Sequence, residues 1–140
     1  MQIEFIGVLG VVGAFFVQLF GGWTQDLKTL LVLMSVDFIM GLLIGFILKK
    51  SSKTITGAGS SKACWTGLVR KGGTLLIVLV GYQLDNATKL GYIRSAVIIA
   101  FIINETISII ENAGIMGIPI PTVIIKAIDV LKDKAESEEN

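Results

Sequence analysis

Residues 27–48 read LKTLLVLMSVDFIMGLLIGFIL, a run in which Lys28 and Asp37 are the charged side chains. A helix needs about 20 mostly apolar residues to cross the roughly 30 Å hydrocarbon core of a lipid bilayer. This run is long enough to do so. We therefore predict that residues 27–48 form a membrane-spanning helix, and the rest of the fold is built around it.

Three further apolar segments flank this run and predict an all-α integral membrane protein. They cover residues 3–20, 67–84 and 91–110. Residues 3–20 lack the basic start and the cleavage pattern of a signal peptide, so we expect this segment to be retained. The segment 67–84 has the weakest signal, because its uncharged part, residues 72–84, is short for a spanning helix. We expect four membrane-spanning helices in a single membrane domain over residues 1–140, or three if segment 67–84 is re-entrant or lies on the surface.

The sequence after the last apolar segment predicts a helix of a different kind. Residues 114–121 read GIMGIPIP, and proline interrupts a helix because it has no backbone N–H to donate. Beyond this break the apolar and charged side chains separate onto two sides, with Ile124, Ile128 and Leu131 on one and Lys126, Asp129 and Asp133 on the other. We therefore predict an amphipathic surface helix over residues 122–134, followed by a polar tail over residues 135–140.

The composition excludes several classes of function. Hydrophobic residues make up 53% of the chain and charged residues 16%, which is unlike a soluble domain. With no histidine and one cysteine, the chain cannot build a Ser-His triad, an intramolecular disulfide or a cysteine-rich zinc site. The formal net charge of +1 gives no strong field to attract nucleic acid. We expect no enzymatic activity, no catalytic residues, no metal and no cofactor.

Basic residues concentrated in one connection predict the orientation in the membrane. The stretch 49–71 carries no acidic residue, and its cations are Lys49, Lys50, Lys53, Lys62, Arg70 and Lys71. Short loops rich in Lys and Arg stay on the cytoplasmic side, so these six residues are the predicted topology determinants. With four spans both chain ends are then cytoplasmic; with three, the C-terminal end lies outside.

Asp37 lies halfway along segment 27–48, where a charged side chain costs about 2.5–3.5 kcal/mol to insert. It must therefore face protein or water, be protonated, or meet a cationic partner. Gly41 and Gly45 follow at intervals of four residues and share its helix stripe, which allows another backbone to approach closely. Two interpretations remain open: an interface between copies of the chain, or ordinary packing within one bundle.

A second polar stripe occupies the end of segment 91–110 and the residues after it. On a helix of 3.6 residues per turn, the following side chains fall within an arc of about 120°: Asn104, Glu105, Ser108, Glu111 and Asn112. This face requires other helices or water rather than lipid. It either lines a pore or subunit interface between assembled copies, or forms a polar seam inside a single compact bundle.

Three motifs, in this order, resemble a known family. Residues 36–41 read VDFIMG, residues 104–112 read NETISIIEN, and residues 117–121 read GIPIP. Their order and spacing between Leu30 and Leu131 resemble the toxin-secretion and phage-lysis holin family of Gram-positive bacteria and their phages.

The resemblance implies a small multi-pass protein of the bacterial (host) cytoplasmic membrane that forms homo-oligomers and opens holes in the bilayer. A cell-wall hydrolase (endolysin), or in some relatives a toxin, then escapes without needing to bind the protein directly. The motif positions would serve structure and assembly. Two other functions are compatible with the residues: a small ion or proton channel or transporter that uses Asp37 and Glu105, and a non-conducting membrane scaffold.

Overall fold

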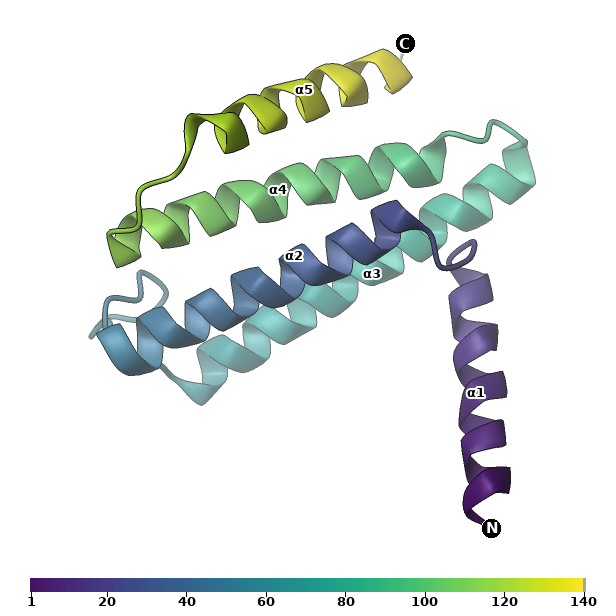
Figure 1. Cartoon of the computed structure of the whole chain (residues 1–140), viewed down its shortest axis with the longest axis horizontal. Coiled ribbons are helices and arrows are strands. Elements are labelled where there is room, and N and C mark those ends of the chain that lie inside the picture. The colour runs from purple at the N-terminus through teal and green to yellow at the C-terminus, as the bar shows by residue number, and fades with distance from the viewer. Residues whose placement is uncertain (140) are drawn as a thin grey trace.

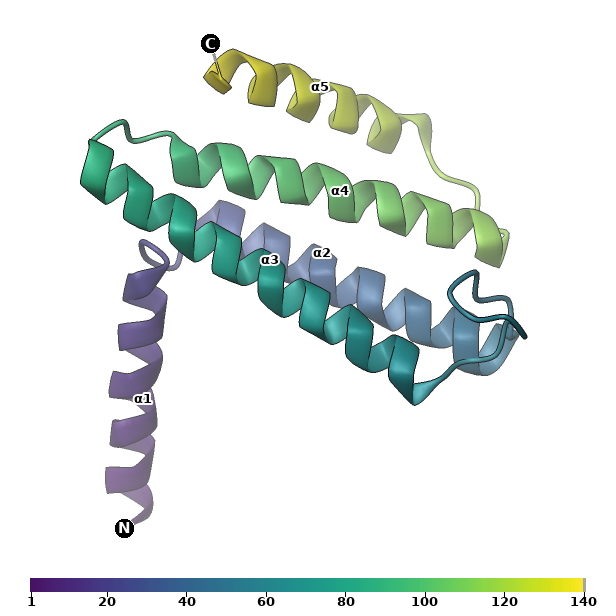
Figure 2. The ribbon, with the colours of Figure 1, turned by 180° about the vertical axis from the view of Figure 1, so that it is seen from behind.

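The computed structural model describes residues 1–139, which form helices joined by short connections (Figure 1). The elements are α1 (Gln2–Leu19), α2 (Gln25–Leu42), the π-helical turn η1 (Leu43–Leu48), α3 (Ser61–Thr88), α4 (Ile93–Met116) and α5 (Thr122–Glu139). Figure 1 and Figure 2 show α2, α3, α4 and α5 side by side, whereas α1 projects away from them. Within residues 1–139 there is no β-strand, so the predicted all-α class is confirmed.

Four helices are long and apolar enough to cross a membrane: α1, α2 continued by η1, α3 and α4. The weakest of the predicted segments is the longest of them, because α3 has 28 residues. It starts at Ser61, ahead of the expected residue 67, since the Ser60 hydroxyl accepts a hydrogen bond from the backbone N–H of Ala63 and caps the helix. The cations Lys62, Arg70 and Lys71 therefore belong to a helix and not to a loop.

The ends of α4 are fixed by two local features. The carboxylate of Asp85 in α3 accepts hydrogen bonds from the backbone N–H groups of Ile93 (2.9 Å) and Arg94 (2.8 Å), so one helix caps the next. At the other end Gly117 adopts a φ of 76°, a left-handed conformation that ends helices and that glycine adopts without strain. The Asp85 cap thus joins the end of α3 to the start of α4, and the two helices run antiparallel (Figure 1).

The apolar core lies where α2, α3 and α4 meet. Its fully or almost fully buried side chains are Leu27, Leu30 and Met34 from α2, Val78 from α3, and Ile98 and Ile102 from α4. Phe101 and Leu131 pack against it from α4 and α5. This core positions the polar residues of the three helices relative to one another.

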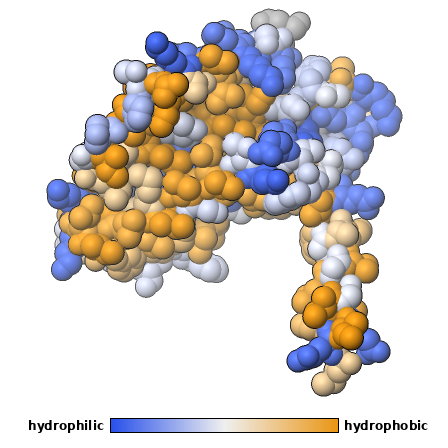
Figure 3. All heavy atoms as spheres, in the orientation of Figure 1, coloured by the Kyte–Doolittle hydropathy of each residue, from blue (hydrophilic) through white to orange (hydrophobic). Residues whose placement is uncertain are grey.

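Helix α5 returns along α4 instead of leaving the bundle (Figure 1, Figure 2). It buries Ile128 and places Leu131 against the core. The helix continues through residues 135–139 of the predicted polar tail, whose last residue, 140, lies outside the described residues. Its exposed charged side chains include Lys126, Asp129, Lys132, Asp133 and Lys134, and Figure 3 shows hydrophilic residues gathered along it. That face requires water or protein, because charge facing lipid is costly.

Helix α1 stands apart from the bundle, and none of its residues, all of which the structure describes, is buried. It is joined to α2 through Gly21 and Gly22, whose φ angles of 87° and 96° form a sharp turn. Its exposed side chains include Phe5, Phe15 and Phe16. Helix α1 does not run alongside α2. Both helices can therefore cross the same bilayer side by side only if the turn at Gly21 and Gly22 changes conformation.

Cysteine labelling from each side of the membrane is expected to show that both chain ends lie on the same side as the basic connection between η1 and α3. Gln2→Cys and Ser137→Cys, each made in a Cys64→Ser background, should react with a membrane-impermeant maleimide from the cytoplasmic side, as the loop control Ser52→Cys should. The measurement compares labelling in intact cells with labelling in inverted vesicles. Labelling of Ser137→Cys in intact cells would instead support three spans.

Candidate functional site

The centre of the bundle contains a buried ion pair network that joins three helices. The ammonium of Lys71 in α3 lies 2.9 Å from Oδ2 of Asp37 in α2 and 2.7 Å from Oε2 of Glu105 in α4. The side chains are 16%, 10% and 8% exposed, respectively. Buried charges need a partner, and here one cation serves two carboxylates.

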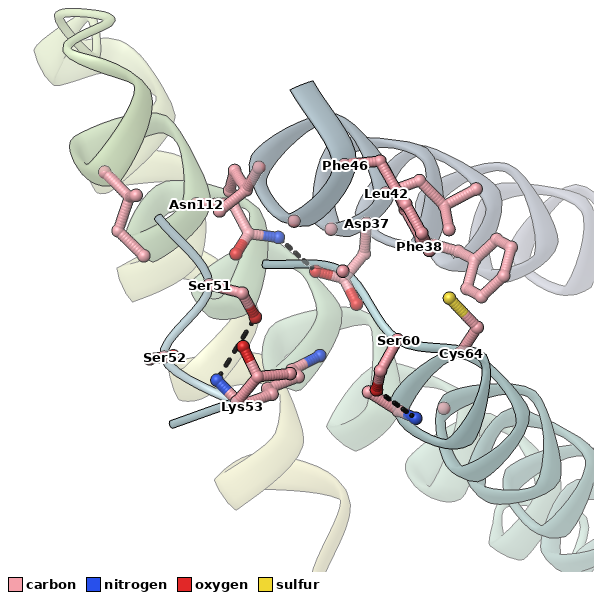
Figure 4. A pocket seen from close by; sticks show the side chains of 18 of the residues that line it. Asp37, Phe38, Leu42, Phe46, Ser51, Ser52, Lys53, Ser60, Cys64 and Asn112 are labelled. Carbon is pink, nitrogen blue, oxygen red and sulfur yellow. Dashed lines mark hydrogen bonds between the residues drawn. The ribbon is translucent and has the colours of Figure 1, made fainter. Parts of the chain in front are cut away.

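Asp37 is the most heavily bonded member of this network. Its second oxygen, Oδ1, accepts hydrogen bonds from the Ser108 hydroxyl (2.6 Å) and from the Asn112 side-chain amide (2.9 Å), and Figure 4 shows the latter contact. The carboxylate therefore receives three side-chain donors from two neighbouring helices. Such saturation is what a carboxylate at this depth requires.

The structure separates the predicted polar stripe of α4 into two groups. Glu105, Ser108 and Asn112 point into the bundle and join the network, as a polar seam within one bundle would. Asn104 and Glu111 are exposed. Any role of these five residues in a contact between copies stays a prediction, and the exposed pair is available for one.

Lys71 is the site residue whose role the sequence analysis missed. The sequence predicts Lys71 as one of the cations that set orientation, and the structure places its ammonium between two carboxylates inside the bundle. The sequence does contain one indication of this role. Carboxylates in the middle of a span need a cation, and Lys71 is the cation of the stretch 49–71 that lies next to the apolar residues 72–84. What the sequence could not supply is the rotation of α3 that turns Lys71 inward and leaves Arg70 exposed.

Gly41 and Gly45 differ in their surroundings. Gly45 is buried, and a Cβ placed there would lie 3.0 Å from the Cα of Gly59, whose N–H donates to the Gly45 carbonyl oxygen at 2.7 Å. The close approach is thus made by the connection between η1 and α3. Among the described residues, nothing lies within 4 Å of a Cβ built at Gly41, so no neighbouring backbone approaches closely there, and a role of Gly41 in a contact between copies stays a prediction.

The folded connection after η1 closes a small pocket above the network (Figure 4). Backbone hydrogen bonds hold it, including one from the Ser51 N–H to the Gly57 carbonyl oxygen at 2.8 Å. The pocket has a volume of about 70 Å³ and reaches Asp37, Lys71 and Asn112. Lys49 and Lys50 lie at the start of the connection after η1 and are exposed.

A larger open cleft, of about 790 Å³, lies between α3 and α4 and reaches the same network. Its polar and charged lining is Asp37, Lys53, Ser60, Lys62, Thr66, Arg70, Lys71, Thr74, Asn104, Glu105 and Ser108. The spacing of Lys62, Thr66, Arg70 and Thr74 at every fourth residue gives α3 a polar stripe that faces the polar stripe of α4. Two candidate spans therefore share a hydrophilic wall, which lipid alone cannot satisfy. We call this opening between α3 and α4 the polar cleft.

A second ionic cluster holds the opposite end of the bundle. The buried guanidinium of Arg94 donates to the Thr24 hydroxyl (2.9 Å), to the Gly22 carbonyl oxygen (3.4 Å) and to the Phe20 carbonyl oxygen. It also lies 3.5 Å from the carboxylate of Asp26. The cluster attaches the turn between α1 and α2 to α4, so its role is structural. Within residues 1–139 no group of three acidic, cysteine or histidine side chains is placed to hold a metal ion.

Comparison with known proteins identifies relatives over most of the chain. Residues 14–133 match the model of the bacteriophage holin family. A probable holin of Bacillus phage phi105 is 31% identical over 112 residues, covering 79% of this chain and 77% of the relative. Uncharacterized proteins of Clostridium perfringens (34% identity, 90% of each chain) and Listeria innocua (35% identity, 96% of this chain and 90% of the relative) are also similar. No solved structure matches.

Proposed function

Because the chain belongs to the bacteriophage holin family, we propose that it assembles in the bacterial cytoplasmic membrane and opens holes through it. A cell-wall hydrolase or a toxin made in the cytoplasm then leaves through these holes. The protein catalyses no reaction in this scheme, and it need not bind the released protein.

The polar cleft is the observation that carries the proposal. It is open, it lies between two candidate spans, and its floor is the Asp37–Lys71–Glu105 network. In a dispersed protomer this wall would face lipid, which leaves polar groups unsatisfied. Assembly with copies either covers the wall or turns it toward water. A growing hole offers the second solution, since each added protomer contributes a hydrophilic lining.

Assembly of this kind depends steeply on the amount of protein in the membrane, because association follows mass action. Membrane depolarisation would reinforce this dependence. Moving one charge across the membrane field is worth about 2.3 kcal/mol per 100 mV, so loss of the field changes the energy of charged groups that shift during assembly. The loop cations and the exposed Glu111 supply charges near the membrane boundary. The expected behaviour is a silent period followed by abrupt permeabilisation.

Dye entry during induced expression tests this proposal. Cells should exclude propidium iodide until the protein passes a threshold amount and should then admit it within a short interval. Asn104→Leu combined with Thr74→Leu makes the polar cleft less hydrophilic and should raise that threshold. A change of about 1 kcal/mol in assembly corresponds to about a fivefold change in threshold concentration.

Ile107→Leu is the matched control, because Ile107 is exposed on α4 and does not line the polar cleft. It should leave the threshold unchanged. Selective ion flux without dye entry would favour a channel, and sealed cells at every expression level would favour a scaffold. Either result would reject hole formation.

A further inference from the structure

The polar cleft carries more positive than negative charge. Lys53, Lys62, Arg70 and Lys71 line it, against the two carboxylates of Asp37 and Glu105. Both carboxylates are already bound to Lys71. In the part of the chain that the structure describes, no ion pair is formed by the other three cations. Lys53, Lys62 and Arg70 therefore give the polar cleft an excess positive charge near the connection between η1 and α3.

The polar lining ends part of the way along the helices. The α3 stripe that carries Lys62, Thr66, Arg70 and Thr74 continues one turn later with Ile77, which is 50% exposed. The neighbouring outer surface of α3 is also apolar, with Val69 and Leu76 exposed. The outer surface of α3 is thus cationic where it borders the polar cleft and apolar beside and beyond it, which matches the charged headgroup and apolar tails of a lipid molecule.

We propose that the polar cleft binds the headgroup phosphate of an anionic phospholipid, held by Lys53, Lys62 and Arg70. The acyl chains lie along the apolar surface of α3. A guanidinium and two ammonium groups suit a phosphate, because Arg offers paired N–H donors and Lys offers a mobile point charge. A zwitterionic lipid brings its own cation and gains less from the excess charge. A bound headgroup covers the cationic part of the hydrophilic wall while the protomer is dispersed, so this site operates before assembly and does not depend on hole formation.

The fluorescence of the two tryptophans can be used to measure lipid binding. Trp65 lies on α3 next to Thr66 and is exposed, whereas Trp23 lies at the opposite end of the bundle. A Trp23→Phe variant therefore reports on lipid chains beside the outer surface of α3 at the loop end, and a Trp65→Phe variant reports on a distant lipid environment. The protein is reconstituted in phosphatidylcholine with increasing brominated phosphatidylglycerol, and quenching of tryptophan fluorescence is followed.

Quenching of Trp65 should reach half its maximum at a lower fraction of brominated phosphatidylglycerol than of brominated phosphatidylcholine. Trp23 should show no such preference. Lys62→Gln combined with Arg70→Gln should raise the required fraction of phosphatidylglycerol about tenfold or more, since each cation near an anionic lipid contributes several-fold in affinity. Circular dichroism verifies that this variant remains folded.

Lys49→Gln combined with Lys50→Gln is the matched control. It removes the same amount of charge from the connection before α3, but neither residue lines the polar cleft, so the lipid preference should persist. Equal losses in both double variants would show general attraction to an anionic surface and would overturn the proposal. Equal quenching by the two lipids would also overturn it. Inorganic phosphate is added as a competitor, and full displacement at millimolar concentration would assign the site to free phosphate instead of lipid.

Discussion

Lys71→Met is expected to destabilise the protein by about 3–5 kcal/mol, a large share of the stability of a small domain. The substitution keeps a long apolar side chain but removes the cation from between Asp37 and Glu105. Two buried carboxylates would then face each other without a cation between them, and the hydrogen bonds from Ser108 and Asn112 to Asp37 alone would not offset the cost of burying both charges. Low accumulation in membranes and a lower unfolding temperature in detergent are the expected signs.

The triple variant Asp37→Asn, Lys71→Met, Glu105→Gln separates this effect from a loss of packing. It replaces all three charges with neutral groups of similar size, so no uncompensated charge remains. We expect most of the stability to return, because neutral replacement of a buried ion network is often well tolerated. If Lys71→Met alone unfolded at the same temperature as the unchanged protein, the network would have no structural importance.

Asp37→Leu is expected to have a larger effect than Glu105→Leu, although both remove one carboxylate from the same cation. Asp37 accepts from Lys71, Ser108 and Asn112, whereas the hydrogen bond found for the Glu105 side chain among residues 1–139 comes from Lys71. Loss of Glu105 leaves Lys71 paired with Asp37. Loss of Asp37 leaves the Asn112 amide and the Ser108 hydroxyl without their acceptor.

The difference between the two variants should be about 2 kcal/mol, the cost of leaving buried donors unsatisfied. Chemical unfolding in detergent, followed by tryptophan fluorescence, measures it. Both variants should also change the time of dye entry, because both change the floor of the polar cleft. Equal stability of the two variants would mean that Ser108 and Asn112 do not depend on Asp37, and unchanged timing would remove these carboxylates from the mechanism.

Hydrophobic runs in the sequence are sufficient to predict the four candidate membrane spans, because length and apolar content decide what can cross a bilayer. The match is close for residues 27–48, which lie within the continuous helix α2–η1 from Gln25 to Leu48. It is poorer for segment 67–84, since polar residues such as Lys62 and Thr66 lowered its hydropathy although the Ser60 cap extends the helix over them. The hydropathy of an apolar run gives no indication of a helix cap that lies outside that run.

Contacts between helices could not be predicted in the same way. The polar stripe of α4 was visible, but its division into inward residues such as Ser108 and exposed residues such as Asn104 depends on where α2 and α3 pack. The return of α5 along α4 depends on the length and direction of the break at residues 117–121. The contact of Gly45 with Gly59 arises in a folded connection without any hydrophobic period. These features are tertiary, and a single sequence carries no direct signal for them.

Release of a folded cytoplasmic enzyme tests the central claim most directly. The protein is expressed together with a cell-wall hydrolase that lacks an export signal, and culture turbidity and hydrolase activity outside the membrane are followed against cells that express the hydrolase alone. We predict a sudden loss of turbidity that coincides with hydrolase release and occurs in the co-expressing cells alone. Intact cells that keep the hydrolase inside, despite abundant protein in their membranes, would contradict the account.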